Sequence, residues 1–501
     1  MAEGVLHSGL AHAAAHTPER VAIRAGAVDW TFGRLDDASD EVARHLAGHG
    51  VGPGGRVAVM TSNRPEFVAA VTAISKLGAA AVLLSPAWKT REVEHAYDLT
   101  GPVHAIADGD SLPVLRAIVG TSAVTDLDDP PLPDEDVAAV GAPVSPDAEA
   151  VLVFSSGTTG LPKAVRHTHR SIGAATEHWV RALGLGPDDR FQVATPPSHI
   201  LGLLNLLAAL RTGATVRLHR RFDLDEILRR IEAERMTLEM AVAPIALAMA
   251  NHPDLERYDL SSLRYIMWGA TPVTESVARV VSARTGVRFL PAYGASELPV
   301  LACNPVASPD AWRLDSAGLP PGDVRLRVVD LDDGRVLGPG EVGEIQATSP
   351  SLMAGYLPAD ATAESMDRGW YRTGDVGWLE PGGWVHLTDR SKEMIKVNGF
   401  QVAPAEVEAV LHGHPAVADC AVFGIPDEHA GEVPVAAVQL RDDAHTTAAE
   451  LRELVAASLA TYKHLRAVAL VDSIPRLPSG KVLRRTLRDA WPFSAAGLKE
   501  G

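Results

Sequence analysis

Strand-like and helix-like segments alternate through much of the chain, and this alternation constrains the fold more than any other feature. A helical pattern of apolar residues at 32–50 leads into a short apolar strand at 56–60. A second helix and strand follow in the same order, at 65–79 and 80–85. The same order returns across 191–236. Strands that alternate with helices build parallel sheets with crossover helices. We therefore predict an α/β fold whose large N-terminal domain consists of layered α/β subdomains.

The pattern changes after residue 318. Short strands and turns fill 324–348, where the DDG and GPGE segments are typical of hairpins, so we expect a small β subdomain there. Beyond residue 392, two helical patterns at 404–414 and 446–460 flank two apolar strands. This arrangement predicts a compact α+β domain at the C-terminal end.

Charge and cysteine content narrow the possible functions. The chain has 46 basic and 63 acidic residues, and a net charge of -17 repels the backbone of DNA or RNA, so no nucleic-acid partner is expected. Cys303 and Cys420 have neither the spacing of a zinc site nor the density of a disulfide-rich secreted protein. We find no leader-like N-terminus and no apolar stretch long enough to span a bilayer. We expect a cytoplasmic protein without a transmembrane segment.

The most distinctive local segment is 151–163, where an apolar strand runs directly into the loop SSGTTGLPK. Gly157 and Gly160 allow the backbone to approach an anion closely, and Lys163 adds a positive charge. The pattern G-x-x-x-x-G-K-[ST] is missing, which argues against an ordinary NTPase or kinase. A flexible surface loop is the alternative, but the preceding apolar strand and the lysine favour triphosphate binding. The hydroxyl donors expected in this loop are Ser155, Ser156, Thr158 and Thr159.

This loop resembles the signature loop of the adenylate-forming superfamily of acyl-CoA synthetases, adenylation domains and luciferases. Further segments resemble motifs of that superfamily in the same order, nearly to the end of the chain. The stretch VNGFQVAPAEVE at 397–408 is most similar to the coumarate-CoA ligase branch. The other matching segments are WGATP at 268–272, YGASE at 293–297, GWYRTGD at 369–375, DRSKEMIK at 389–396 and LPSGKVLRR at 477–485.

The resemblance implies a reaction in two steps. A carboxylate attacks the α-phosphorus of ATP and expels pyrophosphate, and the resulting acyl-adenylate then gives its acyl group to a thiol with release of AMP. We expect ATP, Mg²⁺ and CoA as cofactors, and a monomer or a homodimer. A stand-alone adenylation enzyme that loads a carrier protein's phosphopantetheine thiol is the main alternative. A luciferase-type oxidation and a non-catalytic binding protein remain open, although the latter should lack Lys481, Glu297 or Asp375, and all three are present.

The same resemblance assigns four residues to catalysis. Lys481 is expected to reach into the cleft and bridge carboxylate and phosphate oxygens, and Glu297 is expected to hold Mg²⁺. His199 resembles the histidine beside the acyl pocket. Lys396 matches a residue that in coumarate-CoA ligases contacts the nucleotide or the acyl phosphate.

Nucleotide, hinge and CoA contacts follow from the matching motifs. Tyr293 is expected to face adenine, Ser296 to bond the AMP phosphate and Asp375 to accept from the ribose. Lys392 corresponds to the hinge between domain 1–389 and a mobile domain 393–501, with 390–392 as the connection, and Gly399 is expected to line the CoA channel. The further expected nucleotide-binding residues are Gly269, Ala270, Gly294, Arg390 and Gln401.

The expected acyl pocket is uncharged, which favours an apolar or aromatic acid. Trp268 is bulkier than the small residue common at its position, so we expect it to shorten the acyl tunnel. The residues expected to line the pocket are Ile200, Leu201, Trp268, Pro299 and Val300.

Overall fold

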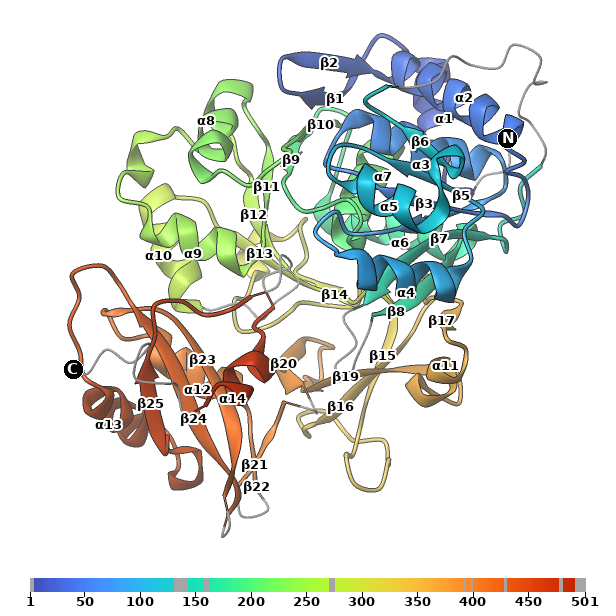
Figure 1. The fold of residues 1–501 in the computed structure, drawn as a ribbon. Helices are drawn as coiled ribbons and strands as arrows, with labels where there is room; N and C mark the ends of the chain where they lie inside the picture. The colour runs from blue at the N-terminus through green and yellow to red at the C-terminus, as the bar shows by residue number, and fades with distance from the viewer. Residues whose placement is uncertain are drawn as a thin grey trace.

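The computed structural model describes residues 4–129, 143–155, 162–269, 275–390, 393–397, 400–427, 430–476 and 481–491. Figure 1 shows a large N-terminal domain, coloured blue to light orange, with a smaller domain in darker orange and red beside it. The predicted α/β fold class and the small α+β domain at the C-terminal end are both confirmed. Among these residues, no helix combines the length and the apolarity needed to cross a bilayer.

The central sheet of the large domain has seven strands in the order β17-β8-β7-β4-β3-β5-β6. The strands from β7 to β6 pair in parallel, as the alternation predicts. β8 instead returns antiparallel to β7, because the segment 156–162 between them is too short for a crossover. The strands are β3 (Arg56–Met60), β4 (Ala80–Leu83), β5 (His104–Ala107), β6 (Val124–Asp126), β7 (Glu149–Ser155), β8 (Lys163–Thr168) and β17 (Gly355–Leu357), with helices α2 (Phe32–Gly48), α3 (Pro65–Lys76), α4 (Thr90–Thr100) and α5 (Ser111–Val119).

Two four-stranded sheets, β2-β1-β10-β9 and β11-β12-β13-β14, complete the α/β part. Only their edge pairs, β1 with β2 and β13 with β14, are antiparallel. Their strands are β1 (Val21–Ala25), β2 (Val28–Thr31), β9 (Arg190–Val193), β10 (Thr215–Leu218), β11 (Leu238–Ala241), β12 (Tyr265–Trp268), β13 (Phe289–Tyr293) and β14 (Ala302–Cys303). The accompanying helices are α1 (Ser8–His16), α6 (His169–Leu183), α7 (Ile200–Thr212), α8 (Leu224–Glu234), α9 (Ala243–Asn251) and α10 (Glu275–Thr285).

Helix α7 lies inside the large domain. Its sequence, ILGLLNLLAALRT, is apolar on nearly every side, which is typical of a helix surrounded by protein. It packs against α1 and α6. The helix begins directly after His199, whose Nδ1 accepts a hydrogen bond from the Leu201 N–H at 3.3 Å. The buried helix therefore fixes the position of His199.

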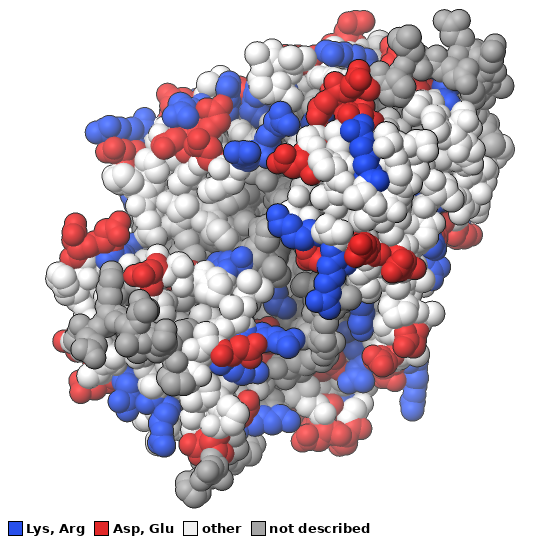
Figure 2. All heavy atoms as spheres, viewed as in Figure 1, with Lys and Arg blue, Asp and Glu red and all other residues white. Residues whose placement is uncertain are grey.

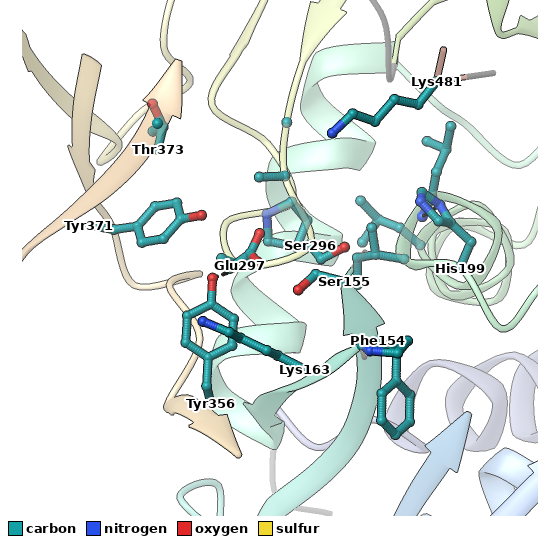
Figure 3. Close-up of a pocket in the computed structure, with 18 of the residues that line it drawn as sticks. Phe154, Ser155, Lys163, His199, Ser296, Glu297, Tyr356, Tyr371, Thr373 and Lys481 are labelled. Atoms are coloured by element: carbon teal, nitrogen blue, oxygen red, sulfur yellow. Dashed lines mark hydrogen bonds between the residues drawn. The ribbon is translucent and has the colours of Figure 1, made fainter. Parts of the chain in front are cut away.

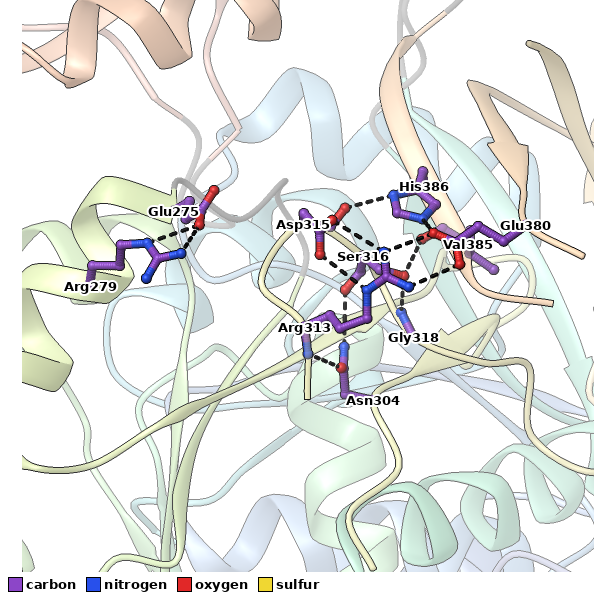
Figure 4. Close-up of polar contacts among 10 residues, drawn as sticks. All are labelled: Glu275, Arg279, Asn304, Arg313, Asp315, Ser316, Gly318, Glu380, Val385 and His386. Atoms are coloured by element: carbon purple, nitrogen blue, oxygen red, sulfur yellow. Dashed lines mark hydrogen bonds and ion pairs between the residues drawn. The ribbon is translucent and has the colours of Figure 1, made fainter. Parts of the chain in front are cut away.

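The predicted β subdomain is a five-stranded antiparallel sheet in the order β15-β16-β19-β18, with β20 also paired to β19, on the edge away from β16. Figure 4 shows how polar contacts hold β20 to the large domain. Glu380 accepts from Arg313 at 2.8 and 2.9 Å and contacts His386 Nε2 at 2.8 Å. β20 is therefore part of the large domain up to Arg390. The elements are β15 (Arg325–Val329), β16 (Gly343–Thr348), β18 (Met366–Asp367), β19 (Trp370–Leu379), β20 (Val385–Arg390) and helix α11 (Asp360–Ser365).

The C-terminal domain is built on a second five-stranded sheet, β22-β21-β24-β23 with β25 beside β24. Its helix α12 contacts α10 and β20 of the large domain, and Arg441 hydrogen-bonds Asn251. The two domains are thus in contact in this arrangement. The elements are β21 (Ile395–Val397), β22 (Phe400–Val402), β23 (Val417–Asp427), β24 (Gly431–Leu440), β25 (Ala467–Leu470), α12 (Pro404–His412), α13 (Ala448–Ser458) and α14 (Arg484–Asp489).

The surface charge has no single-sign region on the face drawn in Figure 2. Basic and acidic side chains are interspersed there, and with a net charge of -17 this face offers no extended basic area for a polyanion.

Buried histidines make the stability of the fold depend on pH. Burial lowers the pKa of His104, His167 and His169 to about 4, from 6.5. As the pH falls from 6.5 toward 4, the unfolded chain binds protons that the native chain does not, so the native state loses stability. At a pH of about 5 each histidine costs on the order of 2 kcal/mol. We expect the melting temperature to fall between about pH 7 and about pH 5.

Glu239 provides a control for this prediction. Burial raises its pKa to about 8, so the native state holds a proton that the unfolded state binds only at lower pH, and this carboxyl offsets part of the loss as the pH falls. Gln192 Nε2 donates to its Oε2 at 2.7 Å. Between about pH 7 and about pH 5, the melting temperature of the Glu239→Gln variant should therefore fall more steeply than that of the wild type. Melting temperatures that stay level over this range in both proteins would contradict the prediction.

Candidate active site

A cavity of about 650 Å³ lies between the central sheet, the β subdomain and the C-terminal domain. Its volume is ordinary for a small-molecule site. Figure 3 shows side chains from the end of β7, the start of β8, the 293–299 loop and β19 converging on it. The C-terminal domain contributes Glu393 and Lys481. Residues far apart in the chain therefore meet at one place.

Lys481 is the lysine that the C-terminal domain presents to the cavity. In Figure 3 its side chain points toward the 293–299 loop, between the parts of the wall formed by Ser296 and His199. Its Nζ lies 3.8 Å from Glu393 Oε1, and Glu393 also pairs with Arg484. The structure thus brings Lys481 into the same cavity as Ser155, at the end of β7.

Glu297 lies on the cavity wall in a set of polar neighbours. Its side chain is only 7% exposed, and its Oε1 accepts from the Tyr356 hydroxyl at 2.6 Å. Lys163 Nζ lies 5.6 Å from the centre of the Tyr356 ring. Burial also raises the pKa of the neighbouring Tyr371 well above its usual value, so this phenol stays neutral.

The Glu297 carboxylate suits Mg²⁺ that arrives with ATP, since magnesium bound to phosphates needs only one or two protein carboxylates. Among the residues that the structure describes, no group of three or more His, Cys, Asp or Glu side chains forms a metal site. A magnesium ion bound with ATP usually takes its other ligands from phosphate oxygens and water.

The loop that carries Ser296 and Glu297 is held by its backbone. His167 Nε2 donates to the Ser296 carbonyl at 2.8 Å, while its Nδ1 lies 3.1 Å from the Ser171 hydroxyl. Burial lowers the pKa of His167 to about 4, so the ring is neutral and serves as one donor and one acceptor. A Cβ on Gly294 would lie 2.0 Å from the Pro299 carbonyl oxygen, so this close turn requires glycine. The loop is therefore pre-organised.

Tyr293 and Asp375 form a buried pair next to the cavity. The Tyr293 hydroxyl donates to Asp375 Oδ2 at 2.5 Å, and each residue is 8% exposed. Tyr293 lines the cavity, as do Thr373 and Gly374 just before Asp375. The β19–β20 register places Arg390 opposite Asp375. The three residues expected around the nucleoside are thus neighbours, although Asp375 itself does not line the cavity.

Family models match most of the chain. The model described as AMP-binding enzyme covers residues 10–357, and the model described as AMP-binding enzyme C-terminal domain covers residues 406–481. The chain belongs to the AMP-binding enzyme family. Its adenylate-forming resemblance is thereby confirmed, and with its ligase relatives it is an AMP-forming acyl-CoA synthetase.

Three relatives of this AMP-binding enzyme illustrate the range of proteins to which the chain is similar. A 4-coumarate–CoA ligase from Oryza sativa subsp. japonica is 36% identical, over 96% of this chain and 92% of its own. The o-succinylbenzoate CoA synthetase MenE from Bacillus subtilis, solved with its acyl-adenylate, is 32% identical with a TM-score of 0.85, over 96% and 98%. The amide bond synthetase McbA from Marinactinospora thermotolerans is 31% identical with a TM-score of 0.87, over 97% and 100%.

His199 lies where the expected acyl end of the cavity begins. Burial lowers its pKa to about 4, so the imidazole is neutral near pH 7. The loop before it is anchored by Asn63, whose Nδ2 donates to the Thr195 carbonyl at 3.2 Å. Gly202 packs so closely on this loop that a Cβ would lie 2.4 Å from the Pro196 carbonyl oxygen.

The acyl-pocket prediction divides into two groups. Ile200, Leu201 and Pro299 line the cavity of this AMP-binding enzyme, as does Gly269. Trp268 and Val300 are 0% exposed and do not line it. Trp268 ends β12 and points away from the cavity, where its ring packs 5.5 Å from that of Phe289 in a hydrophobic core. Trp268 therefore does not shorten the acyl tunnel, contrary to expectation.

Other expected contacts lie away from the cavity or outside the described residues. Lys396 is exposed on β21, opposite Gln401 on β22, and its N–H donates to Glu432 Oε2 at 2.9 Å. Lys396 does not line the cavity in this arrangement. The predictions for Ser156, Gly157, Thr158, Thr159, Gly160, Ala270, Lys392 and Gly399 fall outside the described residues.

Several aromatic wall residues were not anticipated from the sequence. Tyr371 lies inside the GWYRTGD segment and could have been found there, whereas Tyr356 belongs to no matched segment. Trp88, Phe154 and Trp179 also line the cavity. Phe154 and Trp179 sit in apolar patterns that are equally typical of core, and Trp88 lies in the segment between β4 and α4, so only the three-dimensional arrangement identifies them as wall residues.

Proposed function

We propose that this enzyme uses ATP to convert an apolar or aromatic carboxylic acid into its acyl-adenylate and then transfers the acyl group to CoA, releasing AMP. The observation that supports it best is the division of charge along the cavity. The cavity-lining residues from Trp179 to Leu204 in the sequence, which belong to α6, to α7 and to the loop before α7, include no Asp, Glu, Lys or Arg. The charged residues that line the described remainder are Lys163, Glu297, Glu344, Glu364, Arg372, Glu393 and Lys481.

This division suits the first half-reaction. The acid's tail would lie against Ile200, Leu201 and Leu204, and its carboxylate would face the charged part of the cavity. A carboxylate oxygen then attacks the α-phosphorus while the bond to the bridging oxygen breaks and pyrophosphate leaves. Lys481 would stabilise the negative charge that gathers between the two reactants.

Mg²⁺ bound with ATP would neutralise charge on the phosphates, with Glu297 as its protein ligand. Ser155 and Lys163, at the two ends of the expected phosphate loop, would contact the phosphates directly. Tyr293, Thr373 and Gly374 would enclose the nucleoside, with Asp375 beside them.

The second half-reaction requires a different face of the C-terminal domain. With Lys481 in the cavity and Lys396 exposed on β21, the present arrangement fits adenylate formation. A rotation at 390–392 would withdraw Lys481 and bring the β21–β22 side toward the cavity. The CoA thiolate would then attack the acyl carbonyl and AMP would leave.

A screen of carboxylic acids tests the proposal. Pyrophosphate release is measured with ATP and Mg²⁺, and thioester formation is measured with CoA or with a phosphopantetheinylated carrier protein. We expect monocarboxylic acids with apolar or aromatic tails to release pyrophosphate and to yield acyl-CoA. Preference for acids with a charged tail, or thioester formation with the carrier protein and not with CoA, would overturn it.

A further inference from the structure

One part of the uncharged cavity wall is formed by a tryptophan that no matched motif contains. Trp179 lies on α6, lines the cavity and is 3% exposed. Leu204 and Ile200, one turn apart on α7, line the cavity beside it. α6 and α7 pack against each other, so Trp179, Ile200 and Leu204 are carried by two packed helices and not by a loop.

A buried hydrogen bond fixes the orientation of this ring. Trp179 Nε1 donates to Asn205 Oδ1 at 2.7 Å, and Asn205 is 0% exposed. Asn205 Nδ2 has no hydrogen-bond partner among the described residues. Turning the indole away would leave its N–H and the Asn205 side-chain carbonyl unpaired as well, and leaving buried polar groups unpaired is energetically unfavourable. The indole therefore cannot swing aside easily for a longer substrate.

We propose that Trp179, held by Asn205, determines specificity by setting the length of acid that the enzyme accepts. The inference rests on the proposed function, because it assumes that the acid's tail occupies the uncharged end of the cavity. An acid whose tail ends at the indole fits, and each further methylene group must displace a rigid ring. The preferred substrates are accordingly compact acids with a short chain or a single ring.

The test is a series of variants with progressively smaller side chains, Trp179→Phe, Trp179→Leu and Trp179→Ala. Each is assayed for pyrophosphate release with linear acids and with ω-phenyl acids of increasing chain length. The readout is the ratio of kcat/KM for an acid two or three methylenes longer to kcat/KM for the acid that the wild type prefers. We expect this ratio to rise about tenfold or more in Trp179→Ala, less in Trp179→Leu and little in Trp179→Phe.

Trp268 supplies the matched control, since it is a second fully buried tryptophan that does not line the cavity. Trp268→Leu should lower the melting temperature without changing the ratio. If Trp179 has a purely structural role, its variants should behave like Trp268→Leu, with a lower melting temperature and an unchanged kcat/KM ratio. If Trp179→Ala does not fold, the ratio is compared between the wild type and the Trp179→Leu and Trp179→Phe variants, once their melting temperatures show that they are folded.

The possible results separate the two proposals. A wild type that prefers short acids, with a ratio that rises as residue 179 becomes smaller, supports the inference. A wild type that activates apolar acids but keeps its ratio in every folded Trp179 variant overturns the inference and leaves the proposed function standing. A wild type that activates no apolar or aromatic acid overturns both.

Discussion

Lys481→Ala is expected to slow adenylate formation by about a hundredfold or more, the size of effect seen when one charge-stabilising group is removed. The reason is that, among the described residues, Lys481 is the cationic side chain that the C-terminal domain contributes to the cavity, in the part where the proposed function places the phosphates of ATP. Thioester formation from supplied acyl-adenylate should change much less, because that step needs Lys481 withdrawn. The two rates are measured separately, by pyrophosphate release and by acyl-CoA formation.

Two variants sharpen this result. Lys463→Ala removes a lysine of the same domain that pairs with Glu406 at 2.6 Å and does not line the cavity, so its adenylation rate should stay near that of the wild type. Lys396→Ala should show the opposite pattern to Lys481→Ala, with the larger loss in the thioester step. Equal losses in both steps for Lys481→Ala would refute the division of labour between the two faces of the domain.

The large-scale fold was predictable because the hydrophobic patterns of its elements agree with their final environment. The helix expected at 32–50 is α2, and the apolar strands expected at 56–60 and 80–85 are β3 and β4. The antiparallel β8 and β17 were not anticipated, since periodicity gives the element but not its direction. Direction here follows from the short connection after β7 and from the pairing of β17, a segment about 190 residues farther along the chain, with β8.

Site residues could be predicted only where a matched motif assigns a chemical role to a position. Lys481, Glu297 and His199 meet at one cavity, although the roles assigned to them stay predictions. Trp268 and Trp179 show the limit. Both are tryptophans in apolar patterns, and which of them faces the cavity depends on which side of β12 and of α6 packs inward. The sequence alone does not show which side packs inward. Trp268 was therefore expected on the cavity wall, and Trp179 was missed.

Glu297→Gln is expected to lower the rate of adenylate formation by about a hundredfold and to raise the Mg²⁺ concentration needed for half-maximal rate. Glutamine keeps the size of the side chain and an oxygen that can accept from Tyr356, so the change isolates the negative charge. The KM for the acid should change little, because Glu297 is not part of the uncharged end of the cavity. Pyrophosphate release across a magnesium titration measures both effects.

Tyr356→Phe separates charge from position in the same experiment. This variant keeps the Glu297 carboxylate and removes the hydrogen bond to its Oε1, so it should slow adenylate formation about tenfold, the lower end of the effect of losing one hydrogen bond to a charged group. A Glu297→Gln enzyme with an unaltered magnesium requirement would show that the ion is held elsewhere. In that case the buried Glu297–Tyr356 pair would serve to shape the 293–299 loop, and Tyr356→Phe, which removes the hydrogen bond that glutamine keeps, would lose at least as much activity as Glu297→Gln.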